Sequence, residues 1–253
     1  NQNGSQSPKA AEKELFFSIE KTYELFHLLL LLAIDITHYA EVRIDKAKNK
    51  YRPTEQDLNP NTRFIDNKFV KQLRVNKQLN EYVKAKKISW SEHPETIKSL
   101  YESIINSDIY KEYMESEDSS YKADKDFWRK VYKKIFLHSE DLEETLEEMS
   151  IYWNDDIDIV ISFVLKIIKK FEEENKADQP LFPMFKDEED KTYVQKLFND
   201  SIVHSEPYRE MIRKHTQNWD IDRIAIMDII IMQAALSELM TFPAIPVNVT
   251  LNE

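Results

Sequence analysis

Apolar residues recur every three or four positions through most of this chain, and that spacing is typical of one face of an α-helix. The first such segment covers residues 9–49 and contains Leu15, Ile19, Tyr23 and Phe26. A proline-containing loop with one short helical turn follows at residues 51–65. The pattern predicts further helices at residues 64–87, after Pro94, and at 108–114, 124–137, 141–149, after Asn154, 188–204, 206–216 and 220–241. The chain is therefore expected to be all-α, without a sheet.

Composition supports a helical fold and narrows the function. The 253 residues contain one glycine, Gly4, where average usage is roughly 7%. Glycine is needed in tight turns and wherever backbone approaches phosphate, so its near absence argues against Rossmann and P-loop nucleotide sites. The chain has no cysteine, which excludes disulfides, thiolate metal sites and a cysteine nucleophile.

The charge balance favours protein partners over bulk nucleic-acid binding. The formal net charge is −11, whereas binding to phosphate requires a basic face. The most apolar run, residues 25–36, is shorter than the roughly 20 residues that span a bilayer. No signal peptide is visible, so we expect a cytoplasmic protein without membrane contact.

A charged, proline-containing segment at residues 172–183 is the best candidate for a domain boundary. It predicts a helical N-terminal region at residues 1–180 and a second helical domain at 181–253. No internal repeat is convincing.

The end of the chain carries its most specific motif. A long apolar helix ends in Glu238-Leu239, a bend containing Pro246 follows, and Leu251-Asn252-Glu253 come where a new helix begins. This order resembles the signature of the NusB family of transcription antitermination factors. The resemblance covers residues 184–253 and implies a NusB-like helical bundle there, incomplete at its C-terminal end.

The resemblance also implies a function. Members of this family are non-catalytic adaptors that bind boxA-type RNA together with a small-subunit ribosomal protein, NusE, and act indirectly on RNA polymerase. The family core also has an Arg-rich first helix and helices after the Asn-Glu pair, so we expect this chain to be a fragment lacking both ends. Residues 20–180 look like the enlarged N-terminal region of longer members.

One acidic residue is a candidate for partner binding. Asp228 lies among apolar residues and matches an acidic family position that faces NusE. Arg223 lies on the polar stripe of the same helix and is assigned to the same site. An unpaired buried carboxylate is costly, so the alternatives are simple exposure or an internal ion pair with Arg223 or Arg213.

Two basic stretches, residues 43–52 and 68–87, are the only segments suited to phosphate. Both contain aromatic residues, a pattern typical of nucleic-acid contacts, although acids are interspersed and a solvated helical face is the ordinary alternative. The candidate nucleic-acid-binding residues are Arg43, Lys46, Lys48 and Arg52.

Two further groups resemble metal sites, and for each we favour a structural role. Glu24 and His27 have the spacing of a bundle metal site, but no second pair matches them, so a hydrogen-bonded core histidine is expected. Asp155, Asp156 and Asp158 lack the glycine and distal glutamate of a calcium loop, and Asn154 or Asp155 is expected to cap a helix. We predict no metal, no cofactor and no catalytic residue.

Two alternative functions stay open. One is the RNA-binding helical extension of an RNA methyltransferase, since a NusB-like domain also occurs fused to such enzymes. The other is a helical interaction scaffold without an RNA role, which the acidic composition favours.

Overall fold

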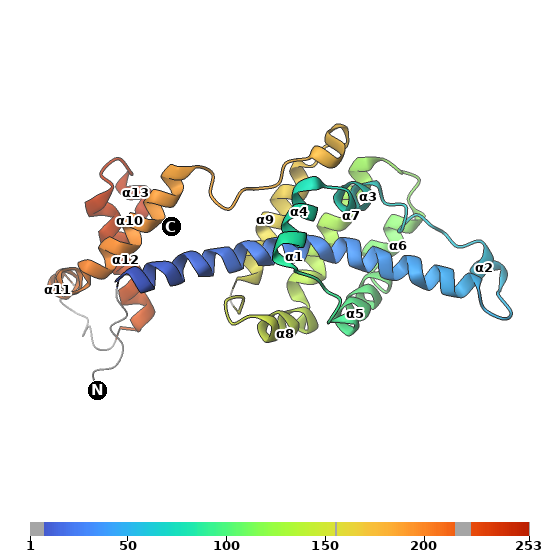
Figure 1. The fold of residues 1–253 in the computed structure, drawn as a ribbon, viewed down its shortest axis with the longest axis horizontal. Helices are drawn as coiled ribbons and strands as arrows, with labels where there is room; N and C mark the ends of the chain where they lie inside the picture. Colours follow the sequence, from blue (N-terminus) through green and yellow to red (C-terminus); the bar gives the residue numbers. More distant parts are fainter. Residues whose placement is uncertain (1–7, 155, 216–223, 253) are drawn as a thin grey trace. The chain divides into compact units, whose positions relative to one another are not determined.

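The computed structural model describes residues 8–154, 156–215 and 224–252 (Figure 1). The chain divides into two units, a larger one at Ser18–Phe182 and a smaller one formed by Asn1–Phe17 with Pro183–Glu253. Every regular element in the described residues is a helix, so the predicted all-α fold is confirmed. The predicted domain limits, 1–180 and 181–253, stay a prediction, and the structure groups the described residues up to Phe17 with the smaller unit.

The longest helix is α1 (Pro8–Lys48), and from Ser18 onward it is the core helix of the larger unit. By length and composition it could cross a bilayer, since its best 18-residue window has a mean hydropathy of 1.5. This stretch is longer than the run at residues 25–36. However, 67% of the window is buried in the structure, and Leu25, Leu28 and Leu32 are fully buried. These side chains therefore pack against protein.

The larger unit surrounds α1 with short helices and loops. Their bounds are α2 (Glu55–Leu58), α3 (Lys68–Arg74), α4 (Lys77–Lys86), α5 (Pro94–Ile105), α6 (Asp108–Glu115), α7 (Tyr121–Lys134), α8 (Glu140–Met149), α9 (Ile157–Lys170), and the 3-10 helices η1 (Phe136–His138) and η2 (Glu173–Asp178). Three aromatic side chains donate hydrogen bonds to carbonyl groups of α1: Trp90 to Leu28, Tyr132 to Leu29 and Trp153 to Lys21. These bonds satisfy polar atoms that would otherwise be buried at a cost.

The predicted helix at residues 64–87 is wrong in its continuity, because the structure has two helices there. The second, α4, begins after Asn76, whose side-chain oxygen accepts a hydrogen bond from the backbone N–H of Leu79 at 2.9 Å. This is an N-cap, which favours a helix start over continuation. The Asn76 amide also donates to the Gln179 carbonyl at 2.7 Å.

The charged segment predicted as a linker is largely part of the larger unit. Gln72 donates hydrogen bonds to the carbonyls of Glu172 and Lys176, both at 2.9 Å. Phe171 and Leu181 are buried in the same core. Composition alone hides this packing, because most of the polar residues between these two anchors face solvent, although Gln179 is buried.

The start of α9 also differs in detail from the expected cap. Its N-cap residue is Asp156, which makes no side-chain capping bond. The Asp156 carboxylate instead accepts a hydrogen bond from Thr22 Oγ1 of α1 at 2.5 Å. Asp155 lies outside the described residues.

The smaller unit contains the three predicted C-terminal helices and a short fourth one. They are α10 (Glu188–Val203), α11 (Ser205–His215), α12 (Ile226–Thr241) and α13 (Val247–Thr250). The predicted beginning of α12 at residues 220–223 lies outside the described residues. The core of this unit is small, with Ile212 and Ile229 buried and Ile224, Met232 and Leu236 packed on them.

Candidate partner-binding site

The Asp200 carboxylate joins the three main helices of the smaller unit. On α10, it accepts hydrogen bonds from the Tyr208 hydroxyl of α11 at 2.6 Å and the Ser237 hydroxyl of α12 at 2.8 Å. His204 Nδ1 lies 2.8 Å from the same carboxylate. Hydrogen bonds to a charged acceptor are stronger than those between neutral groups. The bonds to Asp200 therefore fix how α12 lies against α10 and α11.

The protonation of Asp200 reflects these contacts. Burial alone would raise the pKa of its carboxyl group, but the hydroxyls of Tyr208, Ser237 and Thr241 and the nearby His204 together hold that pKa below its usual value. The carboxylate is therefore ionised at neutral pH and available as an acceptor.

A second carboxylate lies on α12 itself, next to Ser237. Glu238 is buried and accepts a hydrogen bond from the Tyr193 hydroxyl of α10. The Thr250 hydroxyl of α13 and this bond from Tyr193 hold the pKa of Glu238 below its usual value. The Tyr193 ring also packs on Phe242, with ring centroids 4.7 Å apart. Glu238 thus ties α12 to α10 and to the turn that follows α12.

With α12 held in this way, its first half presents an apolar surface to solvent. The large side chains on it are about half exposed or more: Ile226 (73%), Met227 (60%), Ile230 (49%) and Ile231 (61%). We call this set, with the exposed Asp228 among them, the α12 face. Single exposed apolar residues are ordinary, but a contiguous group marks an interaction surface.

Asp228 makes no ion pair with any residue that the structure describes. Arg213, one predicted internal partner, pairs with Glu210 instead. Arg223, the other, lies outside the described residues. Among the alternatives for Asp228, the structure shows a side chain exposed to solvent. The role of Asp228 in partner binding stays a prediction.

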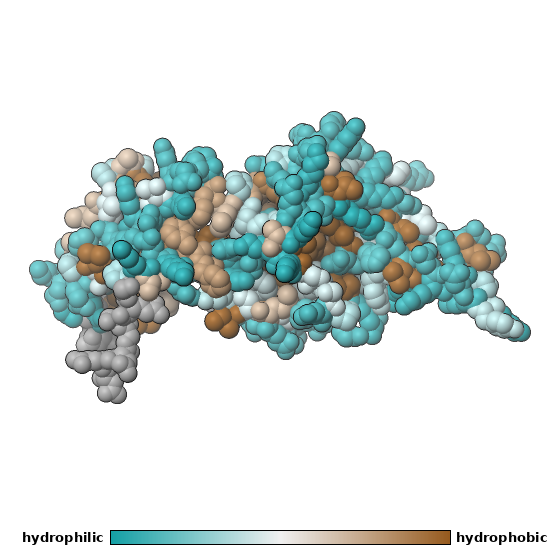
Figure 2. Space-filling view, in the orientation of Figure 1, coloured by the Kyte–Doolittle hydropathy of each residue, from teal (hydrophilic) through white to brown (hydrophobic). Residues whose placement is uncertain are grey.

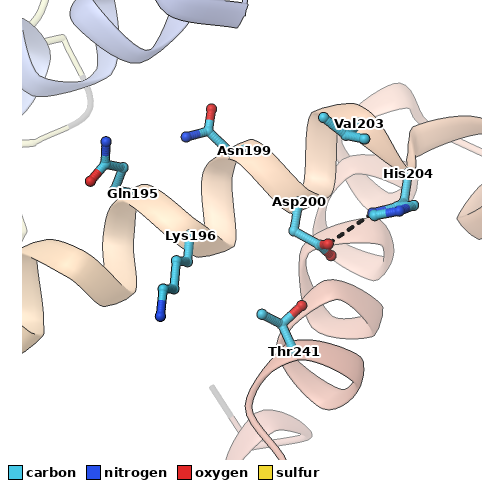
Figure 3. Close-up of a pocket in the computed structure, with 7 residues that line it drawn as sticks. All are labelled: Gln195, Lys196, Asn199, Asp200, Val203, His204 and Thr241. Atoms are coloured by element: carbon cyan, nitrogen blue, oxygen red, sulfur yellow. Dashed lines mark ion pairs between the residues drawn. The ribbon is translucent and has the colours of Figure 1, made fainter.

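A shallow groove of about 370 Å³ lies along α10 (Figure 3). It is lined by Gln195, Lys196, Asn199, Asp200, Val203, His204 and Thr241. The Gln195 and Asn199 amides donate to Glu12 of α1 at 2.7 and 2.6 Å. Asp200 and His204 already take part in the contacts between α10, α11 and α12. We therefore interpret the groove as the border of the helix packing and not as a ligand site.

The predicted nucleic-acid residues all belong to the larger unit. Arg43, Lys46 and Lys48 occupy the last turns of α1, and Arg52 follows in the loop to α2. All four are exposed. The chain therefore separates its predicted RNA contacts and its predicted partner contacts into different units, and their roles stay predictions.

Comparison with known proteins bears on the C-terminal part of the chain. The family model described as NusB family matches residues 162–253. Over these residues the chain is similar to NusB-family proteins. The match begins inside α9 and covers all of α10–α13.

Similar proteins carry the name "Transcription antitermination protein NusB". The protein of Alkaliphilus oremlandii is 31% identical over 78 residues, which are 31% of this chain and 56% of the relative. The protein of Bacillus subtilis is 40% identical over 68 residues, 26% of this chain and 52% of the relative. The chain thus spans about half the length of these NusB relatives. No solved structure matches the chain.

The geometry explains part of the NusB signature and adds residues that the sequence did not reveal. Glu238 connects α12 to α10 through Tyr193, while Asn252 donates to the Asn248 carbonyl at 2.6 Å. Glu253 lies outside the described residues. The Asp200–His204 contact could have been found from its spacing of one helical turn. Nothing local connects Tyr193 to Glu238, 45 positions away.

Proposed function

We propose that this chain is part of a transcription antitermination factor that acts as a non-catalytic adaptor. In this role it binds a NusE-like small-subunit ribosomal protein, and together they bind boxA-type RNA and influence RNA polymerase indirectly. The work is done in the cytoplasm by recognition, without a cofactor. The observation that carries the proposal is the NusB-family match over residues 162–253.

The α12 face supports the same proposal from the structure. An apolar surface with one carboxylate suits a protein partner that brings apolar side chains and a cation. Asp228 would then leave water only when its charge is compensated by that cation. The names of the relatives also favour transcription antitermination over a methyltransferase extension.

Read-through of a terminator by purified RNA polymerase tests the function directly. The expected result is that the chain and a NusE-like protein together increase read-through on a template with a boxA-type element, and not on one with that element scrambled. Equal read-through on both templates contradicts the RNA role. Binding of the ribosomal protein without any read-through supports the scaffold alternative instead.

Reversal of one charge tests the docking face. Asp228→Lys is expected to lose about 2–5 kcal/mol of affinity for the NusE-like protein, because two cations then meet in a desolvated contact. Calorimetric titration measures this, and melting temperature should change little because Asp228 is exposed.

Glu206→Lys is the matched control, since Glu206 is an exposed first-turn acid of α11, as Asp228 is of α12. Both changes place a cation at a helix N-terminus and cost a similar amount there, about 0.3–1 kcal/mol. Equal loss of partner affinity in the two variants removes Asp228 from the interface.

A further inference from the structure

The end of α1 and the loop after it, residues 43–52, form a cationic projection that we call the α1 tip. In Figure 1 the last turns of α1 and α2 extend past α5 and α6, and in Figure 2 the surface there is mostly hydrophilic. The tip contains five cationic residues and one carboxylate, in a chain of net charge −11. Its charge is therefore opposite to that of the protein as a whole.

Most of these cations are not neutralised by the protein. Lys50 pairs with Asp57 at 3.0 Å. Hydrogen bonds from the Thr54 backbone and from Lys50 lower the pKa of Asp57 to about 2, so this carboxylate is ionised at neutral pH. Among the described residues, no carboxylate pairs with the four predicted nucleic-acid residues: Arg43, Lys46, Lys48 and Arg52.

The other basic stretch of the sequence is different. Within residues 68–87, Lys71 pairs with Asp66 at 2.7 Å and Lys77 with Asp178 at 2.6 Å. Lys86 pairs with Glu20, and Arg74 pairs with Glu41 at 3.0 Å. Ion pairs thus engage four of the seven cations in this stretch and one of the five in the tip, so the tip has the larger share of unpaired cations among the described residues.

The tip also presents an aromatic ring to solvent. Tyr51 is 96% exposed, although tyrosine normally buries much of its large ring. The Arg52 guanidinium lies 5.8 Å from the centre of that ring. By contrast, Arg43 lies over Tyr101 at 5.4 Å, on the body of the unit. An exposed ring flanked by cations has the chemistry of a stacking platform for a nucleobase.

We propose that the α1 tip is a contact site for single-stranded RNA. Lys46, Lys48 and Arg52 would contact phosphates, and a base would stack on Tyr51. Stacking requires an unpaired base, since a duplex keeps its bases stacked on one another. The proposal rests on the antitermination function for the identity of the RNA, and it adds a contact outside the NusB-family region.

The decisive comparison uses two matched lysine pairs in the 253-residue chain. Lys46 and Lys48 are the last-turn cations of α1, and Lys133 and Lys134 are those of α7. Binding of a fluorescent single-stranded oligouridylate of about 12 nucleotides is followed by anisotropy. K46E/K48E is expected to weaken binding by about tenfold or more, whereas K133E/K134E changes it less than about twofold. Both variants should keep the helical circular dichroism of the parent, because all four lysines are exposed.

Two further measurements separate phosphate contact from stacking. Lys46→Ala with Lys48→Ala should lower the slope of log affinity against log salt by about 1.4, which corresponds to two lost phosphate contacts. Tyr51→Ala should weaken binding about tenfold, while Tyr51→Phe keeps the ring and stays within about twofold of the parent.

Several outcomes overturn the proposal. They are absence of oligouridylate binding by the parent chain, equal losses in the two lysine pairs, and equal affinity for a duplex of the same length. Stronger binding to phosphatidylcholine vesicles with about one third phosphatidylserine than to RNA assigns the tip to membranes instead.

Read-through is measured separately from RNA binding. If the tip binds RNA but the protein gives no read-through, the antitermination function is contradicted and the tip site stands. If the tip variants bind RNA normally and leave read-through unchanged, only the tip site is contradicted.

Discussion

His27 is the buried titratable residue that most affects the larger unit. It is 2% exposed, Nδ1 donates a hydrogen bond to the Tyr23 carbonyl at 2.8 Å, and its ring stacks on Tyr82 with centroids 3.8 Å apart. Neighbouring Glu24 pairs with Lys21 at 2.7 Å. The expected hydrogen-bonded core histidine is confirmed. Burial lowers the pKa of His27 to about 4, although the bond to Tyr23 acts in the opposite direction.

This pKa predicts an acid-sensitive core. Unfolded histidine has a pKa near 6.5, so between pH 6.5 and 4 the unfolded state binds a proton that the folded state excludes. The stabilisation is complete above pH 6.5 and is lost as pH falls toward 4, by about 3 kcal/mol in total. His27→Gln should flatten this part of the curve, measured as the free energy of urea unfolding at several pH values.

Other groups do not imitate this effect. Asp57 titrates near pH 2, below the window. Burial raises the pKa of Asp35, which makes its contribution opposite in sign, and it is common to both proteins. If the parent and His27→Gln lose stability in parallel between pH 6.5 and 4, the buried neutral His27 is not the cause.

Individual residues were predictable to the extent that their chemistry is local. The spacing of Glu24 and His27 and the charge of residues 43–52 can be read directly from the chain. Whether a cation is available cannot be read this way, because it depends on partners distant in sequence. Lys77 is neutralised by Asp178, 101 positions later.

At the scale of elements, the helices follow from apolar periodicity, and their interruptions depend on single polar side chains. To predict the break between α3 and α4, one would have to know that Asn76 caps α4 and binds the backbone of a distant segment. An asparagine within a helical pattern is compatible with either state. The buried part of residues 171–181 was missed because tertiary contacts, and not composition, hold it in place.

The junction of α10 and α12 depends on Glu238, which leads to a prediction for these two helices. Glu238→Ala removes, at a buried position, the carboxylate that accepts the hydrogen bond from the Tyr193 hydroxyl of α10. The expected loss is about 1–3 kcal/mol in the stability of the smaller unit. It is measured as a lower melting temperature in the helical circular dichroism signal.

Glu238→Gln is the matched variant, since it keeps an oxygen acceptor and nearly the same shape. It should recover most of the stability that Glu238→Ala loses, because a neutral acceptor still satisfies Tyr193. If both substitutions are equally harmful, the negative charge matters more than the hydrogen bond. If neither has an effect, Glu238 does not hold this junction.

At the scale of the whole chain, the two units differ strongly in their cores. The core of the larger unit includes fully buried Trp128, Tyr132, Phe136 and Phe171, whereas in the smaller unit the buried apolar side chains among the described residues are Tyr208, Ile212 and Ile229. Stability follows buried apolar area. The two units are therefore expected to open with different free energies.

Hydrogen exchange measured by mass spectrometry gives the last prediction. Amides of α7 and α9 should exchange only through opening of the larger unit, while those of α10, α11 and α12 exchange much faster through local opening of the smaller one. A NusE-like protein at about 100 times its Kd should slow exchange in α12 by about 100-fold, because a ligand of the folded state stabilises that state by mass action. Asp228→Lys should remove this protection without changing exchange in α7. Uniform protection along the free chain contradicts the unequal cores, and protection by the partner that appears in α7 and not in α12 places the docking surface elsewhere.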